Sequence, residues 1–121
     1  SDPLTLFKYN DRWSIIDPYY GIYFVNNQKE FCSIEEHKKN ICTFIHFKYG
    51  KISNDKISKI FFDKHFKNYD DLIYHYNLIF RLIPSAEDIE NTSIYLRGGR
   101  SYVQIPIHRL VYQIQKYLNL I

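Results

Sequence analysis

The sequence predicts a single α+β domain, because three kinds of pattern follow one another along 121 residues. Short β-prone runs come first, stretches with apolar residues at helical spacing follow, and a Gly-Gly pair between two apolar runs comes near the end. A chain of this length is one domain by size and is long enough to bury a core. It contains no methionine, so we expect residues 1–121 to be a domain of a longer protein.

The first 25 residues are expected to form β-structure. Leu4–Phe7 is a possible strand, and two β-prone runs, Trp13–Ile16 and Gly21–Val25, follow it. The segment between these two runs contains Pro18, which fixes a φ angle, and ends at Gly21, which permits a positive one. This combination predicts a tight turn.

A first helix is expected to begin at Ser33, because Ser33 and Glu36 have the spacing of a capping box. We expect this helix to end near Gly50. Residues 41–47 are β-branched and aromatic enough to form a strand instead, and of the two alternatives we favour the helix.

Two more helices are predicted from their caps and apolar spacing. Ser53 can cap one of them, and Asn68 can cap the other, which Pro84 would end. Residues 85–92 are acidic and are interpreted as a loop.

A β-hairpin over residues 93–105 is predicted next, because Gly98-Gly99 suits a two-residue turn between Ser93–Leu96 and Ser101–Ile105. Its register would pair Tyr95 with Tyr102 on the face turned away from the core. A C-terminal helix is expected after Pro106, with an apolar stripe at Ile107, Leu110, Val111, Ile114, Leu118 and Ile121.

A protein interface is the first functional expectation. The chain has 12 tyrosines and 9 phenylalanines, and the helix predicted over residues 68–83 is apolar on more than one side, so part of it is expected to bury against a partner. A central core helix and an AT-rich coding genome are the plainer explanations of these two features. The candidate interface residues are Tyr74, Tyr76, Phe80, Tyr95 and Tyr102.

A basic surface is the second functional expectation, because charge is divided unevenly. Residues 38–67 hold eight lysines against two aspartates, a net charge of +6, and residues 68–92 hold five acidic residues against one arginine, a net charge of −4. Clustered cations beside tyrosines suit nucleic acid, although a solvated face is the plainer explanation. The candidate residues are Lys48, Lys51, Lys56, Lys59, Lys64, Lys67, Arg97 and Arg100.

No residue pattern points to catalysis, a cofactor or a metal. The pairs Glu35/Glu36 and Asp70/Asp71 fall in predicted first helical turns, where acids complement the helix dipole. Cys42 and His46 would share a helix face, but nothing orients them as a nucleophile and base. The five histidines lack the spacing of a zinc site. We therefore expect no enzyme.

The two cysteines, Cys32 and Cys42, are too few for a disulfide scaffold and are expected to be free thiols in apolar surroundings. A reducing compartment, nuclear or cytoplasmic, follows from that expectation. No apolar run approaches the length needed to span a bilayer, so we expect no membrane association.

The order of elements, three helices followed by a hairpin, resembles a winged-helix domain over roughly residues 33–105, with residues 93–105 as the wing. The resemblance rests on element order and on no residue motif. It implies that the third helix would read DNA in the major groove. Here that helix opens with two aspartates and is otherwise largely apolar, so the protein-interaction use of such domains fits better.

We therefore expect a non-enzymatic protein-interaction or dimerisation module within a larger protein. Self-association is the simplest partner, because symmetric dimers are common. Nucleic-acid binding through residues 48–67 and the hairpin tip is the alternative.

Overall fold

One antiparallel sheet organises the molecule, and the computed structural model describes residues 3–61, 66–97 and 102–106 of it. The strand order is β5-β4-β3-β2-β1-β6. The strands are β1 (Pro3–Tyr9), β2 (Arg12–Asp17), β3 (Ile22–Val25), β4 (Thr43–His46), β5 (Gly50–Lys51) and β6 (Tyr102–Pro106). The helices are α1 (Ile34–Lys38), α2 (Asn54–Ile60), α3 (Tyr69–Leu82) and α4 (Ala86–Arg97). The predicted α+β class is confirmed.

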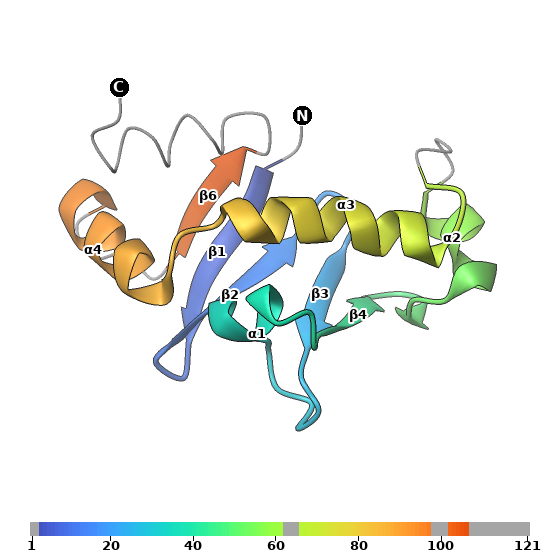
Figure 1. Ribbon diagram of the computed structural model, residues 1–121, viewed down its shortest axis with the longest axis horizontal. Helices are drawn as coiled ribbons and strands as arrows, with labels where there is room; N and C mark the ends of the chain where they lie inside the picture. The colour runs from blue at the N-terminus through green and yellow to red at the C-terminus, as the bar shows by residue number, and fades with distance from the viewer. Residues whose placement is uncertain (1–2, 62–65, 98–101, 107–121) are drawn as a thin grey trace.

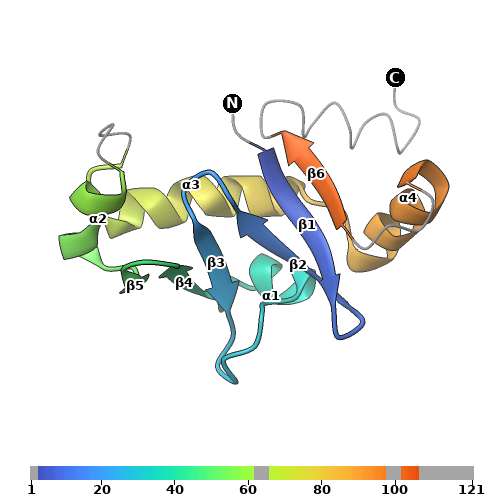
Figure 2. The same ribbon diagram turned by 180° about the vertical axis from the view of Figure 1, so that it is seen from behind.

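The long helix α3 crosses one face of the sheet, and α1 lies on the same side (Figure 1). Seen from behind, the strands lie in front of α3 and no described helix covers them (Figure 2). The sheet therefore has one helix-covered face and one helix-free face.

The core lies between α3 and the strands. Phe24 of β3 makes edge-to-face contacts with Tyr76 and Phe80 of α3, at ring-centroid distances of 5.7 and 5.3 Å, and Phe44 of β4 approaches Tyr76 at 5.5 Å. Because side chains alternate along a strand, the neighbours of these residues point to the helix-free face. Buried aromatic rings thus fix α3 on the sheet.

The N-terminal β prediction is confirmed, including its turn. The carboxylate of Asp17 accepts hydrogen bonds from the amides of Tyr19 (3.1 Å) and Tyr20 (3.3 Å), and Gly21 has φ of +69°. A Cβ at Gly21 would lie against the exposed Phe47 side chain, and the positive φ favours glycine at this position.

The expected helix over residues 41–47 is wrong, because the capped helix α1 ends at Lys38 and β4 follows it. Asn40, with φ of +58°, reverses the chain, and β4 pairs antiparallel with β3, so that Phe44 faces Phe24. The β-branched residues of this segment gain more from completing the sheet than from extending a short helix.

The expected hairpin at 93–105 and the acidic loop at 85–92 are also wrong. Residues 86–97 form α4, and the Ser85 hydroxyl accepts a hydrogen bond of 3.2 Å from the Asp88 amide, as an N-cap does. Residues 102–106 do form a strand, but β6 pairs with β1, where Tyr102 lies opposite Phe7. Tyr95 is helical and does not pair with Tyr102. The winged-helix resemblance is consequently not supported.

Two predicted features lie outside the described residues. They are the Gly98-Gly99 turn and the C-terminal helix after Pro106. Within the described part of the chain, no helix is both long enough and apolar enough to cross a membrane.

The predicted free thiols are wrong, because Cys32 and Cys42 form a disulfide. It ties Cys32, two residues before α1, to the residue directly before β4, and Cys32 is fully buried. The expected reducing compartment was inferred from free thiols, so the disulfide removes the reason for that expectation. Structural disulfides persist mainly in oxidising environments.

Candidate functional site

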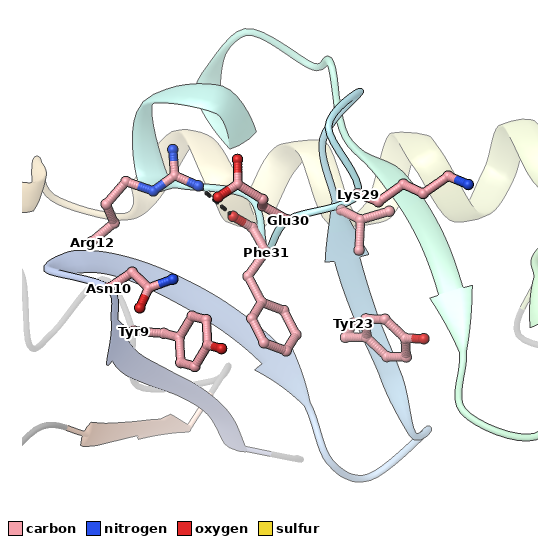
Figure 3. A pocket seen from close by; sticks show the side chains of 8 residues that line it. Tyr9, Asn10, Arg12, Tyr23, Lys29, Glu30 and Phe31 are labelled. Atoms are coloured by element: carbon pink, nitrogen blue, oxygen red, sulfur yellow. Dashed lines mark hydrogen bonds between the residues drawn. The ribbon is translucent and has the colours of Figure 1, made fainter.

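A hollow on the helix-free face is the candidate site (Figure 3). Its volume is about 280 Å³. Its lining comes from the β1–β2 hairpin, from β3 and from the turn after β3, namely Tyr9, Asn10, Arg12, Tyr23, Val25, Lys29, Glu30 and Phe31. The volume lies just below the range of about 300 to 1,000 Å³ typical of small-molecule pockets. It suits one large side chain better than a cofactor.

Phe31 is the centre of the aromatic lining. Its ring lies edge-to-face against Tyr9 at 5.5 Å, Phe7 at 5.1 Å and Tyr23 at 6.0 Å between centroids. Figure 3 shows the rings of Tyr9, Phe31 and Tyr23 side by side in front of the strands. The Tyr9 side chain is 54% exposed, so this aromatic surface is open to solvent.

A network behind the hollow holds Phe31 in place. The Arg12 guanidinium donates a hydrogen bond of 2.9 Å to the Phe31 carbonyl and lies 3.6 Å from the Glu36 carboxylate. Glu36 in turn accepts a hydrogen bond of 2.9 Å from the Ser33 amide, and so completes the predicted capping box of α1. The helix cap and the hollow therefore share one carboxylate.

The ionisation of Glu36 reflects this shared role. Burial alone would raise the pKa of Glu36, but hydrogen bonds from Ser33 and Asn26 and the positive charge of Arg12 outweigh burial and lower it. Glu36 is thus held as a carboxylate, and the Arg12 side chain keeps its anionic partner.

The turn after β3 forms the rim of the hollow. The Asn26 side chain accepts hydrogen bonds from the amides of Gln28 (2.9 Å) and Glu30 (3.0 Å), and Lys29 has φ of +62°. Two cations, Arg12 and Lys29, and one anion, Glu30, line the hollow, and the Glu36 carboxylate behind it balances the charge of Arg12. The site combines apolar rings with a rim that carries both a cation and an anion.

Two of the predicted interface residues lie in the core. Tyr76 is 1% exposed and Phe80 is 2% exposed, so neither can contact a partner on the surface of this fold. Tyr74, on the opposite side of α3, is 69% exposed. Tyr95 lies in α4 and Tyr102 in β6, so the five predicted residues come from three different elements.

The predicted basic residues do not form one surface. Four of the predicted basic residues lie in or next to β5 and α2, namely Lys48, Lys51, Lys56 and Lys59. Arg97 ends α4, which lies at the other end of the molecule from β5 and α2 (Figure 2). Lys67 precedes α3, and Lys64 and Arg100 lie outside the described residues.

The ammonium of Lys56 is already committed within the fold. It donates hydrogen bonds to the carbonyls of Tyr49 (2.8 Å) and Lys51 (3.0 Å). The predicted nucleic-acid surface required the hairpin tip to lie beside the lysines. Because Arg97 ends α4 at the other end of the molecule, it does not form one surface with the lysine segment.

The weak catalytic candidates have structural roles. The Cys42 sulfur is bonded to Cys32, and the His46 Nδ1 accepts hydrogen bonds of 3.1 Å from the amides of Lys48 and Tyr49. Asp70 and Asp71 lie in the first turn of α3, as predicted. Among the described residues, no group of three potential ligands lies close enough to hold a metal ion.

The sequence reasoning missed Tyr9, Tyr23 and Phe31. A signal was present, because Phe7 and Tyr9 alternate with Leu4 and Leu6 along β1, which gives that strand two apolar faces.

Comparison with known proteins gives no further guide, since no protein-family model, curated protein or solved structure matches this chain.

Proposed function

We propose that this protein is a non-enzymatic protein-interaction module that binds a segment of a partner protein in the hollow on its helix-free face. The observation that supports this proposal most is the open cluster of Tyr9, Tyr23 and Phe31 on a sheet face that no described helix covers. Tyrosine and phenylalanine are enriched where protein surfaces meet, because they offer large apolar area at small entropic cost.

The composition of the hollow limits the kind of segment that fits. Its volume of about 280 Å³ takes one large apolar or aromatic side chain, and the exposed ammonium of Lys29 on its rim favours an acidic neighbour in the partner. A partner segment with a large apolar residue beside Asp or Glu is therefore the preferred ligand.

Selection from a random peptide library on the immobilised protein tests this function. We expect enriched peptides that share an apolar residue next to an acidic one. Their affinity for Tyr9→Ala and Tyr23→Ala should fall by about tenfold or more, the usual effect of truncating a central interface tyrosine.

Tyr19→Ala is the matched control, because Tyr19 is an exposed tyrosine, like Tyr9, and lies on the β2–β3 turn outside the hollow. This variant should bind the peptides as the unaltered protein does. Peptides that bind all three variants equally, or a selection that enriches no peptide, would rule out the hollow as the partner site.

A further inference from the structure

The outer side of α3 carries an apolar stripe that the fold leaves exposed. Tyr74, Leu78 and Leu82 are 69%, 43% and 44% exposed, although α3 buries Leu72, Tyr76, Ile79 and Phe80 on its inner side. In Figure 1 α3 lies in front of the sheet, and no described helix or strand lies in front of α3. This stripe faces away from the hollow, on the other side of the sheet.

Two opposite charges lie in line with this stripe. Asp71, Tyr74, Leu78 and Arg81 are spaced three, four and three residues apart, so they fall within about 80° of the helix circumference. All four are exposed. This is the spacing of the apolar seam of a two-helix contact, with an acid at one end and a base at the other.

The arrangement is symmetric about Tyr76. Tyr74 and Leu78 are each two residues from Tyr76, and Asp71 and Arg81 are each five residues from it. An antiparallel second helix centred at the same level would place Tyr74 against Leu78 of the second copy and Asp71 against Arg81 of the second copy. A parallel pair would instead oppose like charges, which is unfavourable.

We propose that two copies of this chain associate through an antiparallel α3–α3 contact. The contact is isologous, so it contains the Tyr74–Leu78 contact and the Asp71–Arg81 ion pair twice each. It goes beyond the proposed function, because it uses the other side of the sheet and leaves both hollows open. A dimer of this kind presents two binding sites to a partner.

Charge reversal tests the contact directly. Sedimentation of the unaltered protein from about 5 to about 500 µM should show a monomer–dimer equilibrium, with a dissociation constant on the order of tens of micromolar for a contact this small. Asp71→Arg and Arg81→Asp should each weaken the dimer by about tenfold or more, because each puts two like-charged pairs into the interface.

An equimolar mixture of the two single variants provides the decisive outcome. In the mixed dimer, both pairs again join an acid to a base, so association should return to within about threefold of the unaltered protein. The double variant Asp71→Arg/Arg81→Asp should recover similarly. Because recovery requires folded chains, it also excludes misfolding as the cause of the losses in the single variants.

Lys51→Glu is the matched control, since Lys51 is an exposed cation that pairs with Ile45 at the β5 edge of the sheet, outside α3. It should leave the dissociation constant unchanged. A monomer at every concentration, a dimer insensitive to the charge reversals, or a mixture that fails to recover would overturn the α3 contact. None of these outcomes bears on peptide binding by the hollow, which is measured separately.

Discussion

His37 is a titratable side chain without a hydrogen-bond partner in the described core. It is 1% exposed, lies between the rings of Phe24 and Phe80 at 4.9 and 4.3 Å, and neither ring nitrogen has a partner among the described residues. Burial lowers the pKa of His37 from its ordinary 6.5 to about 3, and the nearby charge of Glu36 offsets only part of this effect. The folded protein therefore holds His37 neutral.

We expect stability to fall as the pH drops below 6.5. The unfolded chain binds a proton at His37 near pH 6.5, but the folded chain does not until about pH 3. The stability that neutral His37 contributes is therefore complete above pH 6.5 and is lost as the pH falls from 6.5 to about 3. From pH 7.5 to pH 5 the free energy of unfolding should fall by about 2 kcal/mol. Urea denaturation followed by tryptophan fluorescence measures this loss.

His37→Leu is the comparison that isolates this histidine. Between pH 7.5 and pH 5, the free energy of unfolding of this variant should fall by about 2 kcal/mol less than that of the unaltered protein. His46, whose pKa burial also lowers, remains in both proteins and cancels in the comparison. Equal slopes in the two proteins would show that His37 titrates alike in the folded and unfolded states.

Helix α3 has one side in the core and one side exposed to solvent. Its inner side carries the rings that pack on Phe24 and Phe44, and the Tyr76 hydroxyl donates a hydrogen bond to the buried Asp17 carboxylate. Its outer side carries the exposed stripe. The helix begins at Asn68, whose side-chain oxygen accepts a hydrogen bond of 2.9 Å from the Asp71 amide.

Loss of this cap should be measurable. Asn68→Ala leaves the Asp71 amide without its side-chain acceptor, and we expect the free energy of unfolding to fall by about 1 kcal/mol. Asn68→Asp keeps an oxygen at the same place and should stay within about 0.5 kcal/mol of the unaltered protein. If both variants unfold at the same urea concentration, the cap does not stabilise α3.

At the scale of the whole molecule, the disulfide links the segment beside the hollow to the start of β4. Cys32 follows Phe31 directly, and Cys42 precedes β4, so the bond anchors the central ring of the hollow to the strand that packs beneath α3. The covalent link and the Arg12 hydrogen bond fix the position of Phe31 from two sides.

Reduction should weaken the fold as a whole. A link between residues 10 apart lowers the conformational entropy of the unfolded chain, which stabilises the folded state by about 3 kcal/mol. The Cys32→Ala/Cys42→Ala variant should therefore melt at a clearly lower temperature than the oxidised protein. Alkylation under denaturing conditions, read by mass spectrometry, should label no thiol before reduction and two after it. Two labelled thiols in the unreduced protein would contradict the bond.

The sequence by itself determined the features that depend on neighbouring residues. The caps at Ser33 and Asn68, the turn at Gly21 and the α+β class are local, because a few adjacent side chains satisfy the backbone there. The Ser85 cap has the same local signature, although the acidic residues that follow it are also typical of a loop.

Only the tertiary structure decided the features that join distant segments. Residues 43–46 are β-prone by composition, but it is pairing with β3 that makes them a strand. The strand β6 likewise depends on pairing with β1, which lies about a hundred residues earlier in the chain. The hollow needs rings from the β1–β2 hairpin, from β3 and from the turn after it, which only the sheet brings together. Local patterns fix where elements begin, but the burial of apolar area across the sheet fixes which of them meet.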